Sequence, residues 1–189
     1  VNGGAWTSTA MNQVGGGPYR ATIPGQNASA IVQFYVAGQD VPGATSMFPA
    51  AGPDSRALYK VQDDLAVPGG AHELRIVMTA ADTTLLHTNS NLMSNDSLGA
   101  TVIYNENEIF YDVGVRLKGS PYGRPIDQFV SYDVNFHPEQ KFRGVYESIG
   151  IDRSARGPVG SPNVDEIVIR QIANHAGGIA NVYDDIVHV

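Results

Sequence analysis

One alternating stretch, Ile109 to Ser120, constrains the fold of this chain more than any other. Apolar residues fill every second position of its second half, at Val113, Val115 and Leu117. The positions between them are small or charged and include Arg116 and Lys118. A period of two is the signature of a strand that is buried on one face. The stretch therefore predicts a strand with one face in a hydrophobic core and two cations on the other face.

A turn rich in glycine, serine and proline follows this strand, and a further cation lies just beyond it. Backbone N–H groups and positive charge in such a turn can bind an anion. The candidate anion-binding residues are Arg116, Lys118, Gly119, Ser120 and Arg124. The alternative is a solvated strand face and an ordinary turn, since isolated basic residues are common on strands. The residues alone leave both interpretations open.

The composition favours a β-rich globular chain. Its 189 residues suffice for one or two domains, and 42% of them are hydrophobic, enough to pack a core. The 21 glycines and 11 prolines indicate many turns, as in β-rich folds. A run of about 18 apolar residues does not occur, so we expect no membrane span. The start of the sequence carries no basic-then-apolar signal, and we expect a mature or truncated N-terminus.

Charge and cysteine content exclude several function classes. The net charge of −7 argues against a nucleic-acid binder, which needs a basic face. The absence of cysteine excludes disulfides, thiolate metal sites and a cysteine nucleophile. A chain rich in Asn, Thr, Ser and Gly, with few lysines, favours an extracellular or cell-surface location.

Motifs for metal binding or catalysis are absent from the sequence. Its histidines, at positions 72, 87, 137, 175 and 188, have no metal-ligand spacing. The glycine clusters at 15–17 and 157–160 do not match a phosphate-binding loop. No Ser-His-Asp arrangement can be argued from the spacing of these residue types. We therefore predict no metal site and no catalytic residue in this chain.

The first 62 residues alternate short strand patterns with turns, which is typical of a β-sandwich. The order Gly-Pro-Tyr-Arg-Ala-Thr-Ile-Pro-Gly-Gln, then Val-Gln-Phe-Tyr-Val-Ala, then Phe-Pro-Ala-Ala-Gly-Pro resembles bacterial immunoglobulin-like or fibronectin type III-like modules of large secreted proteins. We expect such a sandwich over residues 1–62. Residues 63–71, which contain Pro-Gly-Gly, read as a linker to a second domain at 72–189.

The second domain mixes strand and helix patterns. Strand patterns lie at 72–78, 100–104 and 129–136, with a hairpin turn at 105–108 before the opening strand. Thr79 and Asp82 have the spacing of a helix N-cap pair, and so do Asn163 and Glu166. Gly177 and the glycine after it end the second helix. These patterns predict an α+β domain.

Several runs of this domain resemble the N-terminal part of the CotH kinase family, secreted atypical protein kinases linked to spore coats and bacterial surfaces. They are Tyr-Asp-Val-Gly-Val-Arg-Leu-Lys-Gly-Ser at 111–120, Ser-Tyr-Asp-Val-Asn-Phe at 131–136, Gln-Lys-Phe-Arg-Gly-Val at 140–145 and the helix from Asn163. The resemblance covers 72–189 and implies a β-rich, kinase N-lobe-like fold. It also implies nucleotide binding, with Arg116 and Lys118 on the phosphate side. ATP and a divalent metal would be the cofactors.

The chain also departs from that family. Phe129 and Val130 stand where the family usually has a basic pair. The acidic residues that would hold metal and act in phosphoryl transfer are expected beyond the last residue of this chain. The chain therefore resembles an N-lobe without its catalytic half, and we expect no kinase activity from it alone.

The expected fold is mostly β, a β-sandwich followed by a β-rich, α+β domain that resembles a kinase N-lobe, and the resemblances leave two function classes. One is a non-catalytic extracellular structural or adhesion protein that needs no cofactor. The other is the nucleotide-binding part of a CotH-type atypical kinase. The partners expected are other copies of the chain or the missing C-terminal half. Assembly is assigned to a predicted final strand with Ile186, Val187 and Val189, because a strand at a free chain end is an open edge.

Overall fold

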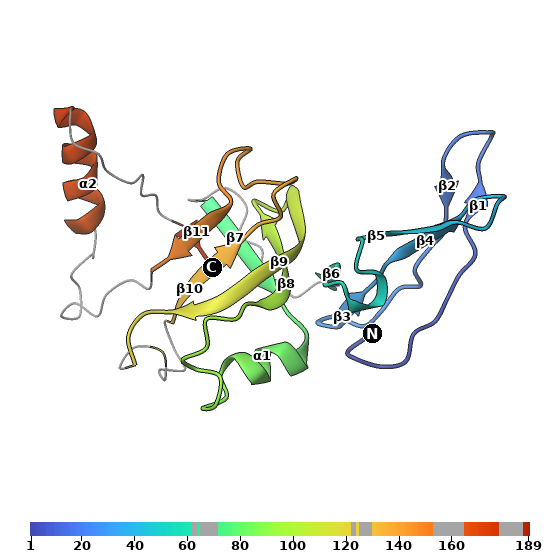
Figure 1. Cartoon of the computed structure of the whole chain (residues 1–189), viewed down its shortest axis with the longest axis horizontal. Coiled ribbons are helices and arrows are strands. Elements are labelled where there is room, and N and C mark those ends of the chain that lie inside the picture. The colour runs from blue at the N-terminus through green and yellow to red at the C-terminus, as the bar shows by residue number, and fades with distance from the viewer. Residues whose placement is uncertain (62–63, 65–71, 122–123, 125–129, 153–164, 178–186) are drawn as a thin grey trace.

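The computed structural model describes residues 1–61, 64, 72–121, 124, 130–152, 165–177 and 187–189 (Figure 1). Strands hold 36% of the described residues and helices 13%, so the prediction of a mostly β fold is confirmed. One large sheet, which we call the main sheet, occupies the second part of the chain. The first 61 residues, the N-terminal region, form smaller pairings beside it.

The main sheet has the strand order β11-β10-β9-β8-β7-β12. Its strands are β7 (His72–Val77), β8 (Leu98–Tyr104), β9 (Glu108–Lys118), β10 (Ser131–Asn135), β11 (Ser148–Ile151) and β12 (Val187–His188). The first five pair antiparallel in chain order, and β12 pairs parallel with β7 at the edge. The predicted strand at 109–120 is thus β9, with neighbours on both sides.

A tight turn joins β8 to β9. Asn105 and Glu106 both have positive φ, 51° and 53°. Such a backbone gives a hairpin the twist of its flanking strands. The N–H of Asn107 closes the turn on the carbonyl of Tyr104 at 3.1 Å. The hairpin turn predicted at 105–108 is confirmed.

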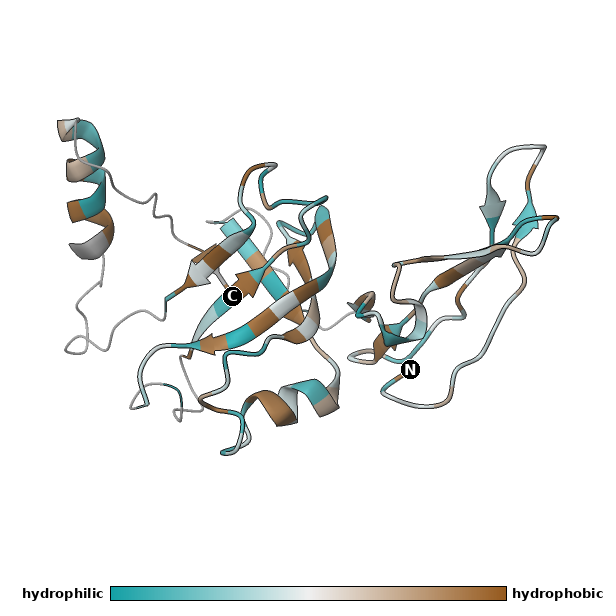
Figure 2. Ribbon diagram, in the orientation of Figure 1, coloured by the Kyte–Doolittle hydropathy of each residue, from teal (hydrophilic) through white to brown (hydrophobic). Residues whose placement is uncertain are grey.

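The hydrophobic core lies on one face of the main sheet. Alternation places Val113, Val115 and Leu117 on this face of β9, each at most 1% exposed. Helix α1 (Ala80–Leu86) covers the core with Leu86, and its N-cap Thr79 accepts the N–H of Asp82 as the spacing predicts. Figure 2 shows the alternating brown and teal bands of the strands. The periodicity of the sequence therefore determines which face is buried.

The N-terminal region contains three separate two-stranded sheets. They pair β1 (Asn12–Gln13) with β2 (Tyr19–Arg20), β3 (Ile31–Gln33) with β6 (Leu58–Lys60), and β4 (Val36–Gln39) with β5 (Thr45–Phe48), with a short 3₁₀ turn η1 (Gly52–Asp54) before β6. The run Val-Gln-Phe-Tyr-Val-Ala, at 32–37, is divided between β3 and β4. Most side chains of β1, β2, β4 and β5 are exposed. The immunoglobulin-like sandwich stays a prediction.

Strand β6 lies against the second face of the main sheet. Leu58 is fully buried and packs with Val77 of β7 and Ile103 of β8. Both sheet residues belong to the face opposite the hydrophobic core, because they alternate with Ile76 and Val102, which pack in it. The N-terminal region thus contacts the main sheet directly, although the predicted linker at 63–71 separates the two in the sequence. The structure describes residue 64 of that linker. The division into two domains at that linker stays a prediction.

Helix α2 (Asp165–Ala176) stands apart from the main sheet in Figure 1. The helix predicted from Asn163 is confirmed over this range, while Asn163 itself lies outside the described residues. Gly177 has φ 71°, the left-handed conformation that glycine adopts after a helix end. Val168, Ile169 and Ile172 are 49%, 65% and 64% exposed. The helix therefore presents apolar side chains to solvent.

Candidate functional site

The two cations of the predicted anion site lie on the polar face of β9, opposite the core. Arg116 stands directly across from Asp133 of β10 in the strand register. The two form an ion pair, and the second amino group of Arg116 donates to Asn95 at 3.4 Å. Arg116 therefore has a carboxylate of its own sheet as its partner.

Lys118 forms the second ion pair of this face. Its Nζ contacts both carboxylate oxygens of Asp152, which follows β11, at 2.8 and 3.0 Å. The lysine lies over Gly150, where an added Cβ would come within 2.9 Å of Nζ. The glycine thus leaves the space through which Lys118 reaches Asp152. The pair is accessible, with side chains 36% and 60% exposed.

The turn after β9 has a structural arginine. Arg124 is 7% exposed and donates to the carbonyls of Gly119, Leu92 and Ser94 at 3.0, 3.0 and 3.1 Å. Its own N–H donates to the carbonyl of Ser120 at 3.2 Å. Gly119 has φ 110°, a backbone that favours glycine. Arg124 therefore holds this turn against the loop after α1, whereas Gly119 and Ser120 are exposed.

The structure brings Arg116 and Lys118 onto one face but leaves neither as an uncompensated charge. Asp133 and Asp152 balance them, so this strip of the sheet carries no excess positive charge. The guanidinium of Arg124 is directed to backbone carbonyls instead. Together the predicted site residues form ion pairs and a loop clamp, an arrangement that stabilises the fold and has weak attraction for an anion.

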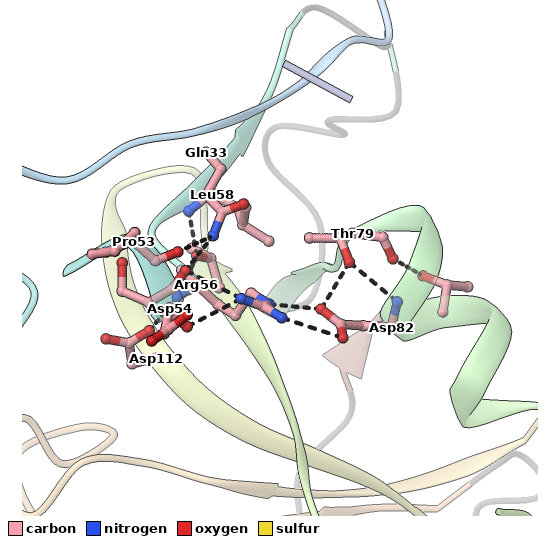
Figure 3. Close-up of polar contacts among 11 residues, drawn as sticks. Gln33, Pro53, Asp54, Arg56, Leu58, Thr79, Asp82 and Asp112 are labelled. Atoms are coloured by element: carbon pink, nitrogen blue, oxygen red, sulfur yellow. Dashed lines mark hydrogen bonds and ion pairs between the residues drawn. The ribbon is translucent and has the colours of Figure 1, made fainter. Parts of the chain in front are cut away.

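A second polar cluster, which the sequence did not predict, joins the N-terminal region to the main sheet (Figure 3). At its centre, the Nε and Nη2 of Arg56 donate to the two carboxylate oxygens of Asp82 in α1 at 2.6 and 3.4 Å. The backbone N–H of Arg56 donates to Asp112 of β9. We call the contacts of residues 54–58 with α1, β8 and β9 the Arg56 junction.

A β-bulge between β8 and β9 builds one side of this junction. Ala100 pairs with Val113 and Val102 pairs with Phe110, so two β9 residues oppose Thr101 alone. One of them is Asp112, whose φ is 54°. A bulge re-aims the side chains around it. Thr101 and Asp112 consequently both contact the segment that enters β6.

Thr101 is fully buried and bridges two groups of the entering segment. Its Oγ1 accepts the N–H of Leu58 at 2.8 Å and donates to the carbonyl of Arg56. From the other side, the amide of Gln33 donates to the carbonyl of Ser55 at 2.5 Å. These hydrogen bonds satisfy backbone groups that would otherwise be buried without a partner.

Electrostatics strengthen the contact between Arg56 and Asp82. The hydrogen bond to Asp82 raises the pKa of Arg56 above its ordinary value against the opposing effect of burial. Burial alone would raise the pKa of Asp82, but the hydrogen bonds from Arg56 and Thr79 hold it below its ordinary value. Both groups are therefore charged over a wider pH range when folded than when unfolded.

Some signals for this junction exist in the sequence. Asp82 is recognisable as the partner of an N-cap, and Thr79 Oγ1 does donate to it at 2.7 Å. Gly99 interrupts an apolar strand, which indicates a close approach of another segment. Asp54 reads as a turn former, and it ends η1. The identity of the approaching segment, which carries Arg56, could not be derived from these signals.

The assembly residues occupy different environments. Val187 pairs with His72 and packs partly buried against the core of the main sheet. Val189 is 53% exposed. Ile186 lies outside the described residues. The final strand is present as β12, and it adds to the β7 edge of its own sheet.

Metal and membrane features were sought in the part of the chain that the structure describes. Within it, no group of three or more histidine, aspartate or glutamate side chains is arranged to hold a metal ion. Neither described helix has both the length and the apolar character needed to cross a membrane. The cofactor prediction stays untested by these observations.

Comparison with known proteins gives no relative for this chain. No family model matches it, and neither does any curated protein or solved structure. The residues and their geometry are therefore the basis for inferring its function.

Proposed function

We propose that this chain is a non-catalytic structural or adhesion protein of the extracellular space or cell surface, able to associate with copies of itself. The observation that supports this function is the pairing of the cations in the candidate anion site. Arg116 contacts Asp133, Lys118 contacts Asp152, and Arg124 contacts backbone carbonyls. The immunoglobulin-like and CotH-like modules are part of the same proposal, on the resemblance of their sequences.

Electrostatics explain why this pairing argues against a nucleotide site. A phosphate that approached Lys118 would have to displace Asp152 or accept its negative charge as a neighbour. It would also face Asp133, which lies one strand away and contacts Arg116. Two unit charges about 4 Å apart near a protein surface interact by roughly 4 kcal/mol. The carboxylates therefore offset most of the attraction that the cations provide.

Titration with Mg-ATP tests the proposal. We expect no saturable heat of binding at ATP concentrations up to about 1 mM, where a weak specific site would still be detected. Lys118→Ala should give the same flat titration. The matched control is Lys141→Ala, since Lys141 pairs with Glu147 at 2.7 Å with a similar exposed fraction of 35%. Saturable binding that Lys118→Ala abolishes and Lys141→Ala retains would overturn the proposal.

The alternative function is the nucleotide-binding part of a CotH-type atypical protein kinase, with ATP and a divalent metal as cofactors. One observation favours it: the Lys118–Asp152 pair is accessible, and exposed pairs of this kind contribute only about 0–1 kcal/mol. A phosphate could replace Asp152 without a large loss of stability. Transfer of label from ATP to the chain or to a generic acceptor, abolished by Lys118→Ala, would establish this alternative.

A further inference from the structure

The N-terminal region contacts the main sheet through residues 54–58 and through the rings of Phe34 and Phe48, which lie 5.6 and 6.2 Å from the ring of Tyr111 in β9, centroid to centroid. Leu58 adds a small buried cluster with Val77, Ile103 and the partly buried Ile31. The core on the opposite face is far larger and contains fourteen buried residues: Leu74, Met78, Leu86, Leu92, Ala100, Val102, Phe110, Val113, Val115, Leu117, Val134, Phe136, Phe142 and Ile151. The polar contacts of Arg56 are the charged part of this attachment.

The charges at the Arg56 junction are unequal in number. One guanidinium faces three carboxylates from separate elements: Asp54 of η1, Asp82 of α1 and Asp112 of β9. Asp82 contacts the guanidinium directly, and Asp112 accepts the backbone N–H of Arg56. Without the arginine charge, the carboxylates would repel one another. Without the carboxylate charges, the buried part of the guanidinium would lose its partners.

We propose that the Arg56 junction is a latch, which acid opens so that the N-terminal region leaves the main sheet while the sheet itself stays folded. The junction opens because the ion pair between Arg56 and Asp82 depends on an ionised carboxylate. The sheet persists because the fourteen-residue cluster described above contains no ionisable side chain. Residues 62–71 keep the released region tethered to β7.

The direction of the pH dependence follows from the lowered pKa of the Asp82 carboxyl group. Asp82 has its pKa lowered in the folded chain, so the ionised form stabilises the closed latch above the ordinary aspartate pKa of about 3.9. This contribution decreases as the pH falls through the ordinary pKa and is lost below the lowered one. We therefore expect opening at pH values below about 4.

Fluorescence energy transfer measures the opening directly, because the chain has no cysteine and two can be introduced. Thr45→Cys places a label on β5 of the N-terminal region, and Thr83→Cys places the other on α1; both threonines are exposed. Amide hydrogen exchange of Val113 and Val115, corrected for the intrinsic effect of pH, reports whether the sheet remains folded. We expect transfer efficiency to fall in acid while these amides stay protected.

Two variants separate the latch from general destabilisation. Asp82→Asn neutralises the carboxylate, and Arg56→Gln neutralises the cation without altering the cap of α1; each should lower transfer efficiency already at neutral pH. The matched control is Glu106→Gln, which neutralises one partner of the exposed Arg75–Glu106 ion pair on the same sheet. It should keep the neutral-pH efficiency and the acid transition of the parent chain.

Two outcomes would overturn the proposal. One is a transfer efficiency that stays constant in acid, and in both junction variants, while the sheet is folded. The other is a loss of Val113 and Val115 protection at the same pH as the fall in transfer, which would mean that junction and sheet unfold together. Neither readout measures nucleotide binding, so this test is independent of the function proposed above.

Discussion

Arg56 crosses β8 directly over Gly99, and a Cβ at Gly99 would lie 2.5 Å from Cγ of Arg56. The glycine is therefore the reason that the arginine can reach Asp82. The contact between Arg56 and Asp82 joins the N-terminal region to α1, and the two residues are 26 positions apart in the sequence. The lack of a side chain at Gly99 is therefore as necessary to the Arg56 junction as the charges of Arg56 and Asp82 are.

Gly99→Ala should destabilise the chain by about 1–3 kcal/mol, because the methyl group would push the Arg56 stem away from β8. Denaturant unfolding measures the difference. Gly25→Ala is the control, since a Cβ at Gly25 meets nothing within 4 Å. Equal stability of both variants would contradict this account of Gly99.

Thr101→Val should cost about 1–3 kcal/mol although valine has nearly the same shape. The hydroxyl accepts the N–H of Leu58 and donates to the carbonyl of Arg56, and both groups would lose a buried partner. Thr101→Ser keeps the hydroxyl and should be less destabilised in the same unfolding experiment. If serine is as damaging as valine, packing and not hydrogen bonding determines the effect.

Phe110→Ala should be the most destabilising of these changes, at about 3–5 kcal/mol. Phe110 is 1% exposed and its ring lies 4.9 Å from the ring of Phe136, centroid to centroid. Phe48 is 60% exposed and serves as the comparison. Thermal unfolding should show a much smaller shift for Phe48→Ala, and a similar shift for both would contradict the assigned core.

Arg124→Ala should destabilise the chain by about 2–4 kcal/mol, since three backbone carbonyls lose a charged donor. The expected result is a lower denaturation midpoint with no change in Mg-ATP titration. Arg20→Ala, at an exposed position of β2, is the control and should unfold like the parent chain. An unchanged midpoint for Arg124→Ala would show that its carbonyl contacts do not stabilise the turn.

Ile172→Lys should reduce self-association, because it places a charge on the apolar surface of α2. Sedimentation velocity over a range of concentrations measures the effect. Asn174→Lys adds the same charge at an exposed polar position of the same helix and should leave association unchanged. A parent chain that stays monomeric at every concentration would exclude the self-association in our proposal.

The sequence by itself determined the local elements. The period of two in β9 assigned Val113, Val115 and Leu117 to the core, and the structure buries all three. The spacing of Thr79 and Asp82 identified the start of α1. These features are readable because they depend on backbone geometry and on residues a few positions apart.

Only the tertiary structure decided which charges meet. Lys118 and Asp152 are 34 positions apart, and Arg56 and the carboxylate of Asp112 are 56 apart. Polar residues at such separations carry no periodic signal, so the sequence showed the cations of β9 but not their partners. Strand register and a β-bulge place those partners, and both arise from long-range pairing that local patterns do not encode. The same reason explains why Arg56, a single residue between η1 and β6, becomes the centre of the contact between two parts of the chain.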